Sequence, residues 1–252
     1  MGKHGIHGSA DGLTAALYQR VAFWLSVFFL LVLIAFWSSY YGVLSRPMPG
    51  AVHFHGGAMT AWCVLLILQA VLIRTGKFRY HRAFGTLSYL LVPLILVSGA
   101  HLAHQTVLKA ASRPDLYYHL IALMFNALLV FLIFYGLAIR YRKQPRTHAR
   151  YMLSTVFPLV TPVTDRIIHK YIHDLVPHLP TIGGAPIAPI VGYLLTDLVV
   201  LGLLLWDWKA HRKLNVFPVV LIVLLIYQIS VMTFYQYNFW RSIGDWIMRL
   251  PL

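Results

Sequence analysis

HGGAMTAWCVLLILQAVLIR, residues 55–74, decides the class of this protein. The run is apolar throughout and ends in arginine, and a run of this length and composition crosses a bilayer as a helix. It also begins with His55, and a histidine one turn inside hydrocarbon is costly unless it binds a metal or a polar partner. The stretch therefore predicts both a membrane helix and a polar site within the membrane.

Six further runs of similar character leave no room for a soluble domain, and hydrophobic residues make up 59% of the chain against 11% charged. We therefore expect an all-α polytopic membrane protein, a single integral membrane domain over residues 1–252. The single cysteine, Cys63, excludes a disulfide within the chain. The seven expected transmembrane helices are 17–44, 51–73, 82–106, 115–140, 148–172, 187–208 and 215–239, with the helical core at 50–172.

The net charge of +14 indicates orientation in the membrane rather than a nucleic-acid partner, because the basic residues concentrate on alternate connections. Fourteen of the 21 Lys and Arg residues lie at the N-terminus or near the connections after the second, fourth and sixth spans. The other seven lie on the opposite side. The positive-inside rule then places the N-terminus in the cytoplasm and the C-terminus outside, and we expect the bacterial inner membrane.

Four histidines lie near the starts of four successive spans, at alternating depths. His55 and His119 are about one turn inside from the outer surface, whereas His81 and His148 open spans from the cytoplasmic surface. Two histidines at matched depth on facing helices can supply both axial ligands of a haem iron. The intervals are nearly equal, 64 residues for the outer pair and 67 for the inner pair. The pattern predicts one or two b-type haems.

The same segments resemble the cytochrome b561 family of transmembrane di-haem electron carriers. The resemblance covers about residues 50–165 and implies a four-helix core with one haem-ligating histidine per helix. An HRxxG element (His81, Arg82, Gly85) is also similar to that of an uncharacterised bacterial membrane family. The segments that carry the resemblance are 55–74, YHRAFGTLSYLLVPLILVSG (80–99), DLYYHLIALMFNALL (115–129) and RTHARYMLSTVFPL (146–159).

The leading hypothesis is therefore a membrane-embedded b-type haem protein, an oxidoreductase if it has enzyme activity. It would transfer electrons across or within the bilayer, between a quinone or small reductant and an acceptor or redox partner. Arg82 and Arg150 lie near the inner histidines in the sequence, and their positive charge would offset haem propionates.

Asp197 lies about ten residues from either end of the sixth expected span. A carboxylate at that depth marks a functional site by default, because an unpaired one would be protonated or strongly destabilising. It could relay a proton or hydrogen-bond a quinone oxygen. It could equally pair with Thr196, Asn126 or a tyrosine and so hold two helices together. The sequence leaves both roles open.

A second hypothesis is a zinc-dependent seven-span membrane hydrolase, in which a zinc ion beneath the outer surface ionises a bound water. His169 and His173 would share one helical face, a spacing that suits a metal. In a third hypothesis the protein is a non-enzymatic accessory or transport protein, and its histidines only tune the membrane interface. The zinc ligands would be His104, His119, Asp165, His169 and His173.

Overall fold

The computed structural model describes residues 5–211 and 215–250, and the side chains of residues 20–209 and 215–250. Within these ranges the chain is all-α except for one β-hairpin, which pairs β1 (Thr181–Ile182) with β2 (Ala185–Pro186). Gly183 and Gly184 form its turn with φ angles of 55° and 76°, in the left-handed region that glycine adopts without strain.

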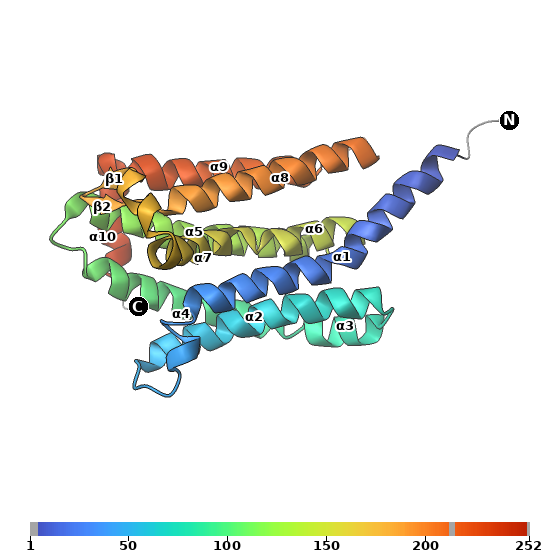
Figure 1. The fold of residues 1–252 in the computed structure, drawn as a ribbon, viewed down its shortest axis with the longest axis horizontal. Coiled ribbons are helices and arrows are strands. Elements are labelled where there is room, and N and C mark those ends of the chain that lie inside the picture. The colour runs from blue at the N-terminus through green and yellow to red at the C-terminus, as the bar shows by residue number, and fades with distance from the viewer. Residues whose placement is uncertain (1–4, 212–214, 251–252) are drawn as a thin grey trace.

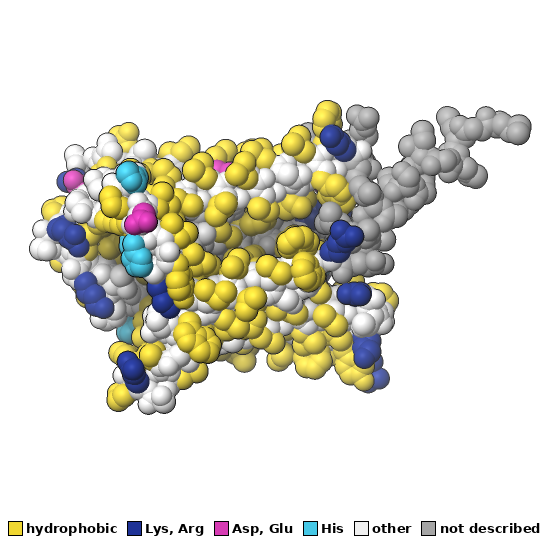
Figure 2. All heavy atoms as spheres, viewed as in Figure 1, with side chains coloured by type: hydrophobic (Ala, Val, Ile, Leu, Met, Phe, Trp, Pro, Cys, Tyr) yellow, Lys and Arg dark blue, Asp and Glu magenta, His cyan; other side chains and the backbone are white. Residues whose placement is uncertain are grey.

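Five helical segments are long and apolar enough to cross a membrane. A helix satisfies its backbone hydrogen bonds internally, as hydrocarbon requires. Figure 2 shows apolar side chains over the middle of the molecule, with Lys and Arg towards its two ends. The protein is thus an integral, multi-pass membrane protein. The segments are α2 (Gly50–Arg74), α3 (Phe78–Gly85) with α4 (Ser88–Leu108), α5 (Pro114–Arg140), α8 (Pro189–His211), and α9 (Phe217–Thr233) with η3 (Phe234–Gln236).

Among the first five expected spans, three differ from the helices observed. The expected span 82–106 is divided between α3 and α4, which are separated at residues 86–87. Helix α1 (Gly5–Phe36) ends before the expected limit of residue 44, and η1 (Tyr41–Val43) forms a turn after it. The expected helix 148–172 is two helices, α6 (Pro145–Ser154) and α7 (Phe157–Tyr171), which follow one another along the bundle (Figure 1). The break has a local cause, because Pro158 has no N–H to donate back into α6 and suits the first turn of a new helix.

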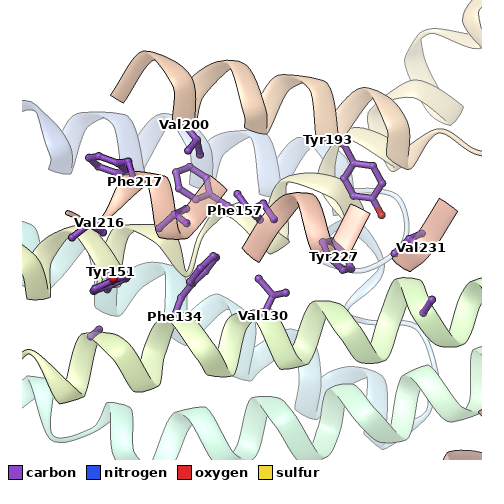
Figure 3. Packing of buried hydrophobic residues seen from close by; sticks show 14 of the residues in the cluster. Val130, Phe134, Tyr151, Phe157, Tyr193, Val200, Val216, Phe217, Tyr227 and Val231 are labelled. Carbon is purple, nitrogen blue, oxygen red and sulfur yellow. The ribbon is translucent and has the colours of Figure 1, made fainter. Parts of the chain in front are cut away.

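The lengthwise helices pack as a closed ring. Helix α1 contacts α2 and α7, α4 contacts α2 and α5, and α9 contacts α5 and α8, while α7 completes the ring against α8. One core cluster joins α5, α8 and α9 around Phe134 and Tyr227 (Figure 3). A second cluster surrounds Trp62, which is 0% exposed, and joins α1, α2, α4, α5 and α7.

The bundle has two unlike ends, which we call the α3 end and the α10 end. The α3 end carries α3, the start of α6 and the end of α8 (Figure 1). The α10 end carries the β-hairpin, η2 (His173–His178) and α10 (Asn238–Met248), which runs across the bundle (Figure 1). Helix α10 buries Trp240 and Gly244 and exposes Phe239 and Trp246. The expected span 215–239 corresponds to α9 with η3, which ends at Gln236, and α10 follows it as a separate helix.

Candidate functional site

His81 and His148 both lie at the α3 end (Figure 1). His81 lies in α3 and His148 in the first turns of α6, and their side chains are near enough to interact electrostatically. The His148 Nδ1 is 2.8 Å from the carbonyl oxygen of Ala138 in α5. Because a carbonyl can only accept, Nδ1 donates, and neutral His148 keeps its lone pair on Nε2. That tautomer suits a metal ligand.

Gln69, a nearly buried residue of α2, fixes the other histidine. In the amide orientation that satisfies both of its ends, Gln69 Nε2 donates to the His81 carbonyl oxygen at 3.0 Å and also to His81 Nδ1. Its Oε1 accepts from the Gly85 N–H at 3.1 Å. Neutral His81 then carries its hydrogen on Nε2, and only rotation of the Gln69 amide would free that nitrogen as a ligand.

Two hydroxyl groups extend this arrangement into a buried polar cluster. The Ser88 Oγ donates to the Gly85 carbonyl oxygen at 2.7 Å and lies 2.9 Å from the Tyr135 hydroxyl, which donates to it. Gly85 thus connects Ser88 to Gln69. We call the resulting set the inner polar cluster; it draws on α2, α3, α4, α5 and α6 and consists of Gln69, His81, Ser88, Tyr135 and His148.

The structure does not bring His55 and His119 together. The His55 Nδ1 is 2.9 Å from Ser98 Oγ, so this ring lies against α4. The His119 Nδ1 donates to the Val231 carbonyl oxygen of α9 at 2.9 Å, and its ring lies edge-on to Tyr235. His119 is 1% exposed. The expected outer ligand pair is thus divided between two different helix contacts.

The space between α2 and α5 is filled by aromatic side chains. The Trp62 ring meets Phe131 edge-on with centroids 5.2 Å apart, and Tyr135 at 5.9 Å. The Trp62 indole N–H has no hydrogen-bond partner among the described residues. These rings pack the middle of the bundle, seven residues beyond His55 in α2 and twelve or more beyond His119 in α5. His55 and His119 do not form a ligand pair because they bond to separate partners, Ser98 on α4 and the Val231 carbonyl on α9.

The two arginines expected near the inner histidines differ in their surroundings. Arg82 is exposed on α3. Arg150 of α6 forms an ion pair with Asp207 of α8, and the side chains are only 11% and 3% exposed. The charge of Arg150 is therefore already compensated. Asp207 was not predicted from the sequence to have such a role. Its position in WDWK (206–209), an acid beside the basic end of the sixth expected span, is the feature that would have indicated an ion pair.

Asp197 has a partner that the sequence did not suggest. Its Oδ1 accepts from Gln228 Nε2 of α9 at 2.8 Å, so the pair joins α8 to α9. The expected partners are occupied elsewhere: Thr196 donates to the Gly192 carbonyl oxygen, and Asn126 donates to Ser230 Oγ at 2.9 Å. Asp197 is half-buried at the seam between the two helices.

The five residues considered as zinc ligands lie in separate places. The His104 Nε2 is 3.1 Å from the Met248 carbonyl oxygen, and His119 faces α9. His169 and Asp165 do lie together, with Nδ1 and Oδ1 3.4 Å apart, whereas His173 begins η2 and is exposed. Among the described residues, no group of three or more His, Cys, Asp or Glu side chains gathers where it could hold a metal ion.

A basic depression lies beside the inner polar cluster. It measures about 350 Å³ and is lined by Ile139, Arg140, Arg142 and Lys143 at the end of α5, directly after the Ala138 that holds His148. It is open to the surface, and three of its four lining side chains are cationic. A smaller cavity of about 50 Å³ between α1, α6, α8 and α9 is lined by Val21, Ala149, Arg150, Leu153, Leu203, Trp206 and Phe217. The α3 end therefore offers an imidazole pair beside a cationic opening.

No protein-family model matches the chain, and no curated protein or solved structure is significantly similar to it.

Proposed function

We propose that the chain crosses the membrane seven times, with the α3 end in the cytoplasm of a bacterium. Helix α1 and the α6–α7 pair would add two crossings to the five long apolar segments. The α6–α7 pair covers residues 145–171, enough to span hydrocarbon at 1.5 Å per residue. Basic residues around α3 and the end of α5 support the orientation. The count of basic residues on this side also included three that lie outside the described residues, Lys3, Arg212 and Lys213.

We further propose that the α3 end binds one b-type haem through His148 and His81 and that the protein transfers electrons within the bilayer. The observation that carries this proposal is that His81 of α3 and His148 of α6, far apart in the sequence, both lie at the α3 end, where the Ala138 carbonyl leaves His148 Nε2 available as a ligand. The expected resemblance of these segments to the cytochrome b561 family motivates the choice of haem. A quinone or small reductant would be the donor.

The residues of the chain would prepare this site in distinct ways. When bound, the haem would supply one-electron chemistry at its iron. Ala138 holds the His148 ring with Nε2 available, and Gln69 would turn its amide so that Oε1 accepts from His81 Nδ1. Arg140, Arg142 and Lys143 would offset the propionates instead of Arg150. Asp197, paired with Gln228, would join helices rather than relay protons.

The absorption spectrum of the purified protein tests the proposal. We expect a Soret band and a reducible α band typical of two axial imidazoles, both lost in His148→Ala and His81→Ala. His169→Ala, an exposed histidine at the other end, is the matched control and should keep the spectrum. A wild-type protein that contains no porphyrin after expression with added haem precursor would overturn the proposal.

A further inference from the structure

Arg166 of α7 is a half-buried cation to which no described carboxylate is hydrogen-bonded. Its Nη1 donates to the Pro162 carbonyl oxygen at 3.0 Å, and its guanidinium lies over the Phe36 ring of α1, 4.2 Å from the centroid. Arginine has five N–H donors, so most of them remain available. A cation withdrawn from water is costly without an anionic partner. Arg166 therefore points to an anion that the described part of the chain does not supply.

The carboxylate nearest in sequence is engaged elsewhere. Asp165 precedes Arg166 and interacts with its charge, but its Oδ1 lies 3.4 Å from His169 Nδ1. Successive residues of a helix point about 100° apart. The Asp165–His169 pair is 34% and 41% exposed, whereas the Arg166 guanidinium lies over Phe36 of α1, and its charge also acts on His55 of α2. The Asp165–His169 pair and the Arg166 side chain thus occupy different faces of α7.

Arg166 and His55 lie at a similar depth below the α10 end of the bundle. Arg166 lies five residues before the end of α7 at Tyr171, and His55 lies five residues after the start of α2 at Gly50. At 1.5 Å per residue, both are about 7–8 Å below the α10 end of their helices. Lys170 follows one turn further out on the same face of α7, with its Nζ over the Tyr171 ring. Two cations therefore lead from the surface into the bundle.

His55 contributes a hydrogen-bond acceptor to the same place. The Ser98 hydroxyl donates to the Leu94 carbonyl oxygen at 2.6 Å, so it can only accept from His55 Nδ1. Neutral His55 then keeps the lone pair on Nε2. A hydroxyl group of a bound molecule can donate to this nitrogen while an anionic oxygen of the same molecule accepts from Arg166.

We propose that Arg166, with His55 beside it and Lys170 above it, holds the headgroup of one anionic phospholipid from the leaflet at the α10 end. The phosphate would bind the guanidinium and a headgroup hydroxyl would bind His55, a combination that fits a glycerol-phosphate headgroup. Basic clefts between transmembrane helices bind such headgroups. This site is independent of the haem proposal and gives His55 a role apart from iron.

Native mass spectrometry of the full chain released from lipid nanodiscs tests this site. The nanodiscs contain phosphatidylglycerol, phosphatidic acid or phosphatidylcholine, at equal total lipid. We expect one phosphatidylglycerol retained per chain, less phosphatidic acid, and no phosphatidylcholine. In Arg166→Gln the retained fraction should fall about tenfold or more, since a charge-assisted phosphate contact is lost. Arg166→Lys should restore part of it, and Arg113→Gln, an exposed arginine at the same end, should leave it unchanged.

Two further arms keep the result decisive. His55→Ala should weaken retention of phosphatidylglycerol but not of phosphatidic acid, which lacks the headgroup hydroxyl, while the absorption spectrum stays unaltered. Excess inorganic phosphate should not displace the lipid; displacement would identify a free-phosphate site and overturn the proposal. Equal retention of phosphatidylcholine, or of phosphatidylglycerol by wild type and Arg166→Gln, would overturn it too. If Arg166→Gln does not fold, the comparison of the three lipids on the wild-type chain alone decides.

Discussion

The histidines at the two ends of the bundle differ in their hydrogen-bond partners. At the α3 end, His81 bonds to Gln69 of α2 and His148 to the Ala138 carbonyl of α5, and the two side chains share one end of the bundle. At the α10 end, His55 and His119 bond to Ser98 and Val231 on different helices. Spacing along the chain is nearly the same for both pairs, so sequence interval alone does not decide which histidines meet.

The face that each residue occupies on its helix explains the difference. His119, Ala122 and Asn126 lie on the same face of α5, and that face packs against α9. Leu128 is nine residues after His119, which is two and a half helical turns, so it lies on the opposite face of α5. On that face Leu128 lies against Gly99 of α4, which is also next to His55. The α3-end histidines sit instead on the short helices α3 and α6, whose direction is independent of the long helices that follow.

The largest expected effect concerns the ion pair that ties α6 to the rest of the α3 end. Asp207→Ala should destabilise the protein by about 3–5 kcal/mol, because it leaves Arg150 as an uncompensated, nearly buried charge. Equilibrium unfolding in mixed micelles measures this. The double variant Arg150→Met/Asp207→Leu should regain most of the loss, since apolar residues of similar volume need no partner. A loss below about 1 kcal/mol in Asp207→Ala would show that the pair does not anchor α6.

An intermediate effect is expected at the α10 end, where α4 and α5 approach closely. A Cβ at Gly99 would lie 2.8 Å from Leu128 Cδ2 and 3.2 Å from His55 Cε1. Gly99→Val should therefore cost about 1–3 kcal/mol through overpacking. Gly136→Val is the matched control in α5, because a Cβ there meets nothing within 4 Å. The same loss in both variants would mean that close packing against His55 does not matter.

The smallest expected effect is a single interhelical hydrogen bond between α5 and α9. Asn126→Ala removes the donor to Ser230 Oγ and should cost about 0.6 kcal/mol, the average for such bonds in membranes. A double-mutant cycle with Ser230→Ala isolates the coupling between the two side chains. A coupling near zero would indicate that apolar packing alone sets the face on which His119 lies.

Much of the fold followed from the sequence. The expected helices 51–73 and 115–140 agree with Gly50–Arg74 and Pro114–Arg140, because apolar runs with proline or glycine at the start and arginine at the end have clear limits. The break between α6 and α7 and the separate helices α3 and α10 were missed. Each depends on a local bend within or beside an apolar run, which hydropathy alone does not reveal.

The candidate site was less predictable than the fold. The depth of a histidine can be read from its position in an apolar run, but the helix that it faces depends on how the helices rotate and pack. Gln69 and Asp207 gained their roles in the same way, since each is an isolated polar residue whose partner is distant in sequence. Only the packed structure shows that His148 has a neighbour and that His119 has a different one.

The haem content of each chain tests the central claim most directly, because it asks which end of the bundle is built for a cofactor. Measured as porphyrin per polypeptide, the wild-type protein should contain one haem, and the double variant His55→Ala/His119→Ala should contain the same amount, whereas His148→Ala should contain none. Two haems per chain, or loss of haem from the His55→Ala/His119→Ala variant while His148→Ala keeps it, would contradict the account.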